Sequence, residues 1–165
     1  MDAMKQRWVS LFVENDIGVL AKISGLFSSK LYNLDSLTVG VTEDPTISRM
    51  TIGLTSDDKT FEQITKQLNR CVEVIKVIDF TNIPTHSREL LFVKVNRITE
   101  ADKMELFRIT SVYPLKIVDY NKNTAILQAV EDRDTNDELV KLLSSFFINR
   151  IEVVRGGSVA IESFF

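Results

Sequence analysis

The chain contains few of the residues on which disulfides, metal sites and histidine catalysis depend. Its 165 residues include one cysteine, Cys71, and one histidine, His86. A single cysteine cannot form an internal disulfide, which is typical of a protein from a reducing compartment. Cys71 lies where an expected helix passes into a strand, so we interpret it as a small buried hydrophobe rather than a nucleophile. His86 has no metal-ligating neighbour in the sequence, and we identify no catalytic residue and no metal site.

Long apolar runs and an excess of positive charge are also missing. No apolar run approaches the length of a membrane span, and the first residues lack the apolar core of a signal peptide. The net charge is −3 and the isoelectric point is near 5.3, whereas nucleic-acid-binding proteins usually present a basic face. Neither a phosphate-binding loop nor a dinucleotide-binding glycine pattern occurs. With a hydrophobic content of 44%, we expect a globular cytoplasmic protein that binds neither nucleic acid nor membrane.

Two series of strands and helices with the same order follow one another along the chain. In the first series, we expect strands near residues 8–14, 34–42, 49–55 and 72–78, and helices near residues 18–30 and after a cap at residues 56–58. A polar, proline-containing stretch at residues 81–87 is a predicted linker. In the second series, we expect strands near residues 90–95, 115–119, 124–130 and 151–154, with helices after Thr99 and after a capping box at residues 135–138. The pair Gly156-Gly157 is expected to begin a tail.

The order βαββαβ, found twice, predicts an α+β protein of two ferredoxin-like domains. Each domain would be a four-stranded antiparallel sheet with two helices on one face. The predicted domains are residues 1–80 and residues 88–165, joined by the linker 81–87. One helix layer leaves the other sheet face open, and Trp8, Phe12, Leu90 and Phe92 are expected on these open faces. We therefore expect the open faces or the sheet edges to meet a second copy of the chain in a homodimer.

The sequence Asn15-Asp16-Ile17-Gly18, between the first strand and the first helix, is the best candidate for a binding site. At such a junction, free backbone N–H groups and a helix N-terminus face the same small region, where a carboxylate can bind. Taken alone, this spacing favours a helix cap followed by a turn glycine. The matching junction of the second domain, residues 95–99, has no glycine, which indicates that the fold does not require one. This comparison favours a site for a small anion such as an amino acid.

Several segments of the first domain resemble a known family. The segments VENDIGVL (residues 13–20) and ISGLF (residues 23–27) resemble the start of an ACT domain. The segments YNLDSLTV (32–39), DPTISRMTI (44–52) and EQITKQLN (62–69) are similar to the small regulatory subunits of acetohydroxyacid synthase, also called acetolactate synthase. The resemblance is strong between Trp8 and Val77 and looser through residues 88–90, 116–119 and 151–157. It implies that the first domain is an ACT domain and the second an ACT-related domain.

The resemblance implies regulation of an enzyme rather than catalysis. Small subunits of this family bind the catalytic large subunit, raise its activity and confer feedback inhibition by valine or another branched-chain amino acid, within branched-chain amino-acid biosynthesis. No cofactor is then expected in this chain, because thiamine diphosphate, magnesium and FAD belong to the large subunit. An alternative stays open: a free-standing ACT-type amino-acid sensor that controls another enzyme or a regulator.

The resemblance also implies an effector site shared between two chains. Carried over by motif, one chain would contribute Asn15, Asp16, Gly18, Val19 and Leu20, and the other chain Asn33 and Leu34. Backbone N–H groups near Gly18 would hold the carboxylate of the effector. The Asn15 side-chain carbonyl, with Asp16, would accept from its ammonium group. Leu20 and Leu34 would shelter a small aliphatic side chain.

Overall fold

The computed structural model describes residues 3–29 and 32–164, and the chain divides into two units. The first unit contains the residues up to His86 together with those from Ser158 onward, and the second contains Ser87–Gly157. These units differ from the predicted domains, since the C-terminal segment joins the first unit and not the second. The predicted linker is also shorter than expected, because a strand already begins at Thr85. The predicted end of the first helix, at Lys30, lies outside the described residues.

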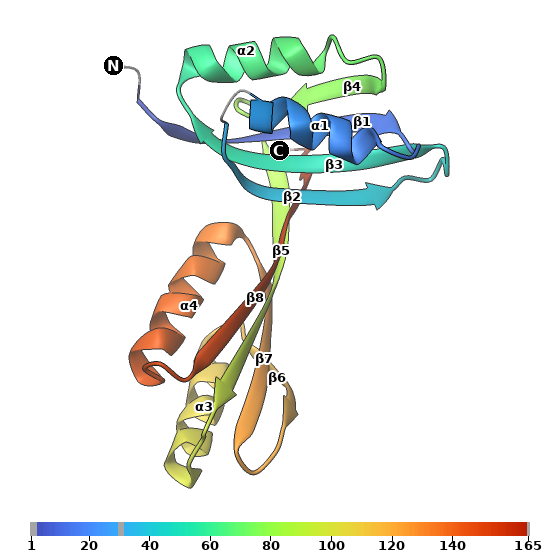
Figure 1. Cartoon of the computed structure of the whole chain (residues 1–165). Helices are drawn as coiled ribbons and strands as arrows, with labels where there is room; N and C mark the ends of the chain where they lie inside the picture. Colours follow the sequence, from blue (N-terminus) through green and yellow to red (C-terminus); the bar gives the residue numbers. More distant parts are fainter. Residues whose placement is uncertain (1–2, 30–31, 165) are drawn as a thin grey trace. The chain divides into compact units, whose positions relative to one another are not determined.

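Each unit has the predicted element order (Figure 1). The first contains β1 (Lys5–Glu14), α1 (Val19–Ser29), β2 (Leu34–Val41), β3 (Ile47–Ser56), α2 (Asp58–Leu68) and β4 (Val74–Asp79). The second contains β5 (Thr85–Asn96), α3 (Glu100–Val112), β6 (Lys116–Tyr120), β7 (Thr124–Glu131), α4 (Arg133–Phe146) and β8 (Ile151–Glu162). None of the described helices is long and apolar enough to cross a membrane.

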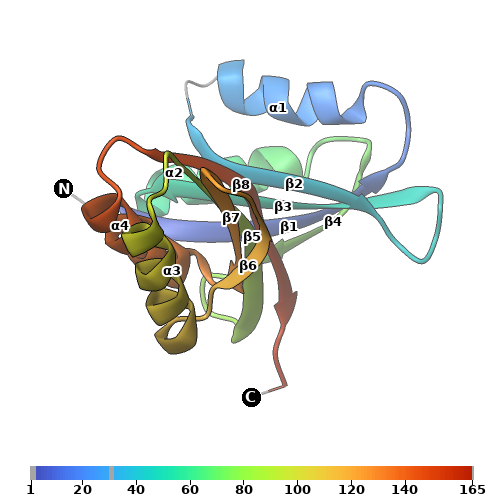
Figure 2. The same ribbon diagram turned by 90° about the horizontal axis from the view of Figure 1, so that it is seen from below.

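Both units are built on a four-stranded sheet with the same strand order. The first sheet has the order β2-β3-β1-β4, which Figure 2 shows side by side, and the second has the order β6-β7-β5-β8. In the first sheet, β1 pairs antiparallel with both β3 and β4, and β2 pairs antiparallel with β3. The two central strands are therefore the first and third strands of each series, as a ferredoxin-like βαββαβ unit requires. The predicted α+β class and the duplicated fold are confirmed.

The cores form where the apolar rows of the central strands meet the helices. Alternation along β1 places Val9, Leu11 and Val13 on the helix side, where each is fully buried. Helices α1 and α2 cover this row with Ile23, Phe27, Phe61, Ile64 and Leu68. The second unit repeats the arrangement with Leu91, Val93 and Val95 of β5 against Leu106, Ile109, Leu139 and Leu143. This packing holds the N-terminus of α1, where the candidate site lies, in a fixed position on the sheet.

Two local predictions in the second unit are wrong. The residues expected to form a capping box at 135–138 lie inside α4, because Asp132 is the N-cap and accepts from the Thr135 N–H at 2.8 Å. The helix thus begins three residues earlier than predicted, and Asp132 caps its first turn. The pair Gly156-Gly157 does not begin a tail, because β8 continues through it to Glu162, with Gly157 at a φ of 76°.

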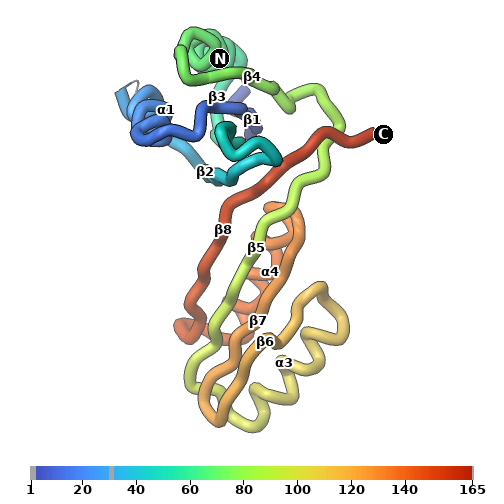
Figure 3. The backbone as a smooth tube through the Cα atoms, turned by 90° about the vertical axis from the view of Figure 1, so that its right-hand side faces the viewer, coloured from blue at the N-terminus to red at the C-terminus, as the bar shows by residue number. Residues whose placement is uncertain are grey.

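The end of β8 packs on the open face of the first sheet. The Thr38 hydroxyl donates to the Ser158 carbonyl at 3.1 Å, and Arg49 Nη2 donates to the Ala160 carbonyl at 3.1 Å. Ser158 and Ala160 are buried. The chain passes between the two units at β5 and β8, which are neighbouring strands (Figure 3). Part of the sheet face that was expected to meet a second copy is therefore covered by the chain's own C-terminal segment.

Candidate functional site

The loop between β1 and α1 is attached to the turn between β2 and β3. The backbone N–H of Asn15 donates to the Thr46 carbonyl at 2.7 Å. The Asn15 side chain continues this attachment, because its Nδ2 donates to the Pro45 carbonyl and its Oδ1 accepts from the Ser48 hydroxyl, both at 2.9 Å. The asparagine thus holds the loop at one end of the sheet.

Gly18 directly precedes α1 and has a φ of 90°, a conformation that L side chains rarely adopt. No heavy atom lies within 4 Å of the position that a Cβ would take, so backbone conformation rather than crowding selects glycine here. In the second unit, Arg97 has a φ of 56° at the corresponding strand-to-helix junction. Both junctions therefore need a left-handed residue, but only the first uses a glycine that leaves the backbone accessible.

The backbone of this loop offers unoccupied donors. Within the described part of the chain, the N–H groups of Asp16, Ile17 and Gly18 donate to no protein acceptor. They lie at the N-terminus of α1, where the helix dipole contributes a partial positive charge. Free N–H groups at a helix N-terminus form a favourable environment for a carboxylate or another small anion.

A hollow of about 320 Å³ adjoins these donors. It is lined by Glu14, Asp16, Ile17, Gly18, Val19, Lys22 and Glu73. Lys22 Nζ and Glu73 Oε1 form an ion pair at 2.5 Å. The hydrogen bond between them raises the pKa of Lys22 and lowers the pKa of Glu73, so both are charged at neutral pH. A small hollow with charges of both signs and free N–H donors suits a zwitterion better than a simple anion.

One chain does not bring all the predicted site residues together. Val19 is 6% exposed and packs in the core, so it anchors α1, whereas Leu20 is 46% exposed and is not among the residues that line the hollow. Asn33 is exposed and Leu34 is half-buried, and both follow the other end of α1. A helix of 11 residues is roughly 16 Å long, so these two residues lie at the opposite end of the unit from Gly18. Asn33 lines a separate hollow of about 370 Å³ that includes Tyr32.

Two residues of the hollow, Lys22 and Glu73, were not anticipated. Lys22 lies one helical turn after Gly18, and that spacing was the available sequence signal. Glu73 lies more than fifty residues further along the chain, in the segment before β4. It reaches the hollow because the Glu14 N–H donates to the Glu73 carbonyl at 3.0 Å. No local pattern marks such a residue.

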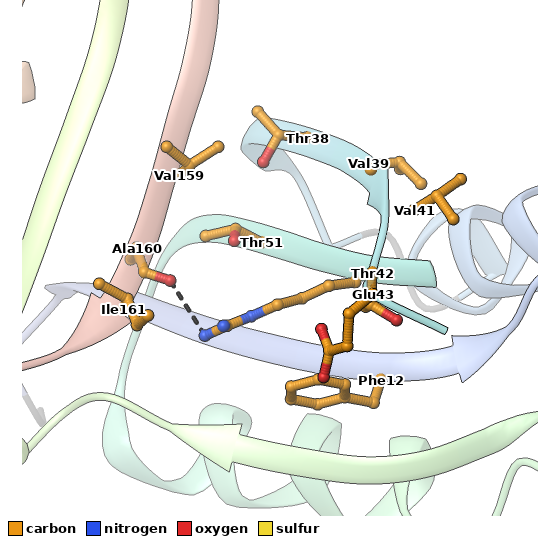
Figure 4. A pocket seen from close by; sticks show the side chains of 12 residues that line it. Phe12, Thr38, Val39, Val41, Thr42, Glu43, Thr51, Val159, Ala160 and Ile161 are labelled. Atoms are coloured by element: carbon orange, nitrogen blue, oxygen red, sulfur yellow. Dashed lines mark hydrogen bonds between the residues drawn. The ribbon is translucent and has the colours of Figure 1, made fainter. Parts of the chain in front are cut away.

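A larger hollow, of about 530 Å³, lies on the open face of the first sheet (Figure 4). Its walls include Phe12, Val39, Glu43 and Arg49, with Val159, Ala160 and Ile161 of the C-terminal segment. The Arg49 guanidinium lies over the Phe12 ring at 5.1 Å, and its Nε donates to the Ser10 hydroxyl at 2.8 Å. Since the same guanidinium also holds the Ala160 carbonyl, this arginine primarily attaches the C-terminal segment to the sheet. Among the described residues, no group of three or more His, Cys, Asp or Glu side chains could hold a metal ion.

Comparison with known proteins identifies the family from both halves of the chain. Residues 9–76 match the "AHAS small subunit-like ACT domain", and residues 88–163 match the "Small subunit of acetolactate synthase". The chain belongs to the family of acetolactate synthase small subunits. The resemblance seen in the sequence is thereby confirmed, and it extends over the second unit, where the sequence motifs matched more loosely. Membership agrees with the predicted role of a non-catalytic regulatory subunit.

Individual acetolactate synthase small subunits are similar to this chain over nearly its whole length. The small subunit of Aquifex aeolicus is 37% identical over 159 residues, which cover 96% of this chain and 82% of the relative. The isozyme 3 small subunit of Salmonella typhimurium is also 37% identical and covers 95% of both chains. The crystal structure of the small subunit from Thermotoga maritima has a TM-score of 0.84 at 33% identity and covers 98% of this chain and 99% of its own.

Proposed function

We propose that this chain binds the catalytic large subunit of acetolactate synthase, raises its activity, and makes it sensitive to feedback inhibition by valine or a related branched-chain amino acid. The observation that carries this proposal is the hollow at the N-terminus of α1. Its free N–H groups and its charges of both signs suit an amino-acid zwitterion. The cofactors thiamine diphosphate, magnesium and FAD would be held by the catalytic partner.

The effector site would be completed by a second copy of the chain. In the first sheet β2 is an edge strand, and an edge strand offers unpaired backbone groups to another strand. The candidate loop lies at the end of β2 near Val41, because Asn15 bonds to the turn that follows. Antiparallel pairing of two β2 strands about a two-fold axis would place Leu34 of one chain beside the Val41 end of the other. This geometry would unite Asn33 and Leu34 of one chain with the Gly18 loop of the other.

A ligand held by two chains would also stabilise their interface. If the catalytic subunit binds one state of that interface better, the ligand shifts the equilibrium between active and inhibited complexes. The match of the second unit to the small-subunit family supports this function over a free-standing sensor. Co-purification of the chain with the large subunit distinguishes the regulatory subunit from the free-standing sensor. If the chain leaves the activity of the large subunit unchanged, the free-standing sensor is favoured.

The homodimer is testable at the exposed edge. Val39→Lys puts a charge on β2, close to its symmetry copy, and like charges on paired strands repel. We expect sedimentation equilibrium to show a weaker dimer for this variant. Val72→Lys, at an 85% exposed position outside the sheet, is the matched control and should leave the dimer unchanged. Equal dimer affinity of the two variants would exclude β2 as the interface.

Calorimetry on two variants of Gly18 tests the effector site. We expect the wild type to bind valine, leucine or isoleucine. Asn and Asp have nearly the same shape, and both tolerate positive φ better than most residues, so they differ chiefly in charge. Gly18→Asn should retain binding within a few-fold, whereas Gly18→Asp should lose it because its carboxylate repels that of the ligand. If a folded Gly18→Asp protein binds as well as Gly18→Asn, the loop is not the carboxylate site.

A further inference from the structure

We propose that Glu73 binds the ammonium group of the effector. This assignment rests on the proposed function and adds a residue to it. A zwitterion needs an acceptor for its ammonium group as well as donors for its carboxylate. The question is which buried acceptor at the hollow beside the α1 loop lacks a hydrogen-bond donor.

Of the two acceptors expected from the sequence, Asn15 and Asp16, Asn15 is bound to the β2–β3 turn and to β3. Its Oδ1 accepts from the Ser48 hydroxyl at 2.9 Å, and its Nδ2 donates to the Pro45 carbonyl at 2.9 Å. Asn15 is also not among the residues that line the hollow next to Gly18. The asparagine therefore fixes the loop to the β2–β3 turn, and the acceptor for the ammonium is sought among the residues that line the hollow.

Glu73, unlike Asn15, lines the hollow and has a carboxylate oxygen without a donor. Its Oε1 is paired with Lys22 Nζ at 2.5 Å, while its Oε2 is buried and has no hydrogen-bond partner in the described structure. A buried carboxylate oxygen without a donor is costly, so a ligand that supplies one gains the corresponding free energy. An ammonium group has three donors and can satisfy this oxygen.

The position of Glu73 suits this role. Its backbone is held next to the end of β1 by the hydrogen bond from the Glu14 N–H, and its side chain is 22% exposed at the hollow. Lys22 keeps the pKa of the Glu73 carboxyl low, so the charge is present at neutral pH. The Lys22 side chain is 55% exposed, which leaves it free to move aside when a ligand ammonium enters.

The two ends of an amino acid would thus be held from different parts of the chain. The N–H groups of residues 16–18 would receive the carboxylate, and Glu73 would receive the ammonium. This arrangement makes the site selective for an α-amino acid over the same acid without its amino group.

The test compares two ligands on two proteins by calorimetry, using the full chain. The ligands are valine and 3-methylbutanoate, which is valine without the amino group. Glu73→Gln keeps the shape of the side chain but removes its charge. A charge-assisted hydrogen bond is roughly twice as strong as a neutral one, so valine should bind about tenfold more weakly to this variant. Binding of 3-methylbutanoate should change less than about twofold, because it lacks the ammonium.

Two further variants keep the result interpretable. Glu62→Gln breaks an ion pair between Glu62 and Lys66 on the exposed face of α2, and valine binding should not change. Glu73→Asp keeps the negative charge and should retain more valine affinity than Glu73→Gln.

An equal loss for both ligands would mean that Glu73 merely supports the fold, and no loss for valine would mean that it does not touch the ligand. Either result overturns the assignment while leaving the effector site in place. A wild type that binds neither ligand would overturn the proposed effector site itself, and the Glu73 assignment with it.

Discussion

Replacement of Asp102 by asparagine should destabilise the second unit in a pH-dependent way. Asp102 lies in the first turn of α3, where its side chain accepts from the N–H of Thr99 at 2.7 Å and from the hydroxyl of Thr99 at 2.9 Å. It also accepts from Arg150 Nη1 and Nη2, at 2.8 and 3.1 Å. The carboxylate therefore completes a capping box and binds an arginine from the segment before β8 at the same time.

The size of the effect follows from these contacts. An N-terminal cap contributes about 1 kcal/mol, and hydrogen bonds to a charged group contribute about 1.5–3 kcal/mol. Because the asparagine side chain keeps part of the cap, we expect Asp102→Asn to lower the free energy of unfolding by about 2–3 kcal/mol at pH 7.

The pH dependence has a definite sign. The Arg150 guanidinium and the Thr99 donors hold the pKa of Asp102 well below its usual range. The carboxylate therefore stabilises the folded state fully above its unfolded pKa, which is about 4, and this contribution is lost as the pH falls below that value. The difference between wild type and Asp102→Asn should accordingly shrink from pH 7 towards pH 2.

The assay must report on the second unit. The single tryptophan, Trp8, belongs to the first unit, so urea unfolding should be followed by amide NMR signals of α3 and α4. Glu105→Gln is the matched control, because Glu105 pairs with a largely exposed Arg108 on the same helix and should contribute less than about 0.5 kcal/mol. The reasoning is refuted if Asp102→Asn costs no more than this control, or if its cost is the same at pH 7 and pH 3.

Three other substitutions test the packing. In Gly53→Ala the new Cβ would lie 2.4 Å from a ring carbon of Trp8, so we expect about 1–3 kcal/mol of destabilisation in guanidinium unfolding followed by Trp8 fluorescence. Gly25→Ala, on α1 with no atom within 4 Å of the new Cβ, should instead stabilise the first unit by about 0.5–1 kcal/mol in the same assay. Arg155→Met removes the cation that pairs with Asp137 and with Glu89, which is 4% exposed, and should destabilise the second unit by about 3 kcal/mol in calorimetric unfolding; a loss below about 1 kcal/mol would contradict this.

The fold was predictable because apolar residues recur every second residue in the strands and every three to four residues in the helices, and these are the residues that pack in the cores. Val9, Leu11 and Val13 alternate along β1, and all three are buried against the helices. The N-cap of α4 was mispredicted because two nearby residues, Asp132 and Thr135, can both cap a helix. Only the packing of α4 chooses between them. The glycine pair in β8 looked like the start of a tail, but strand pairing carries the chain straight through it.

The candidate site was only partly predictable, because some of its residues are far from the others along the chain. The loop that ends at Gly18 is local, so its free N–H groups follow from the strand-to-helix junction. Glu73 approaches that loop only through the pairing of β1 and β4, which no local pattern encodes. Asn33 and Leu34 lie at the far end of α1, and their place in the site depends on the resemblance and on a second chain.

The central claim is that this chain regulates acetolactate synthase in response to an amino acid held at the α1 loop. The most direct measurement is the activity of the catalytic large subunit, with and without this chain, as valine is titrated. The account predicts that the chain raises the activity and that valine then lowers it, with little response to valine when Gly18→Asp is used in its place. Unchanged activity on adding the chain, or equal valine inhibition with Gly18→Asp, would contradict it.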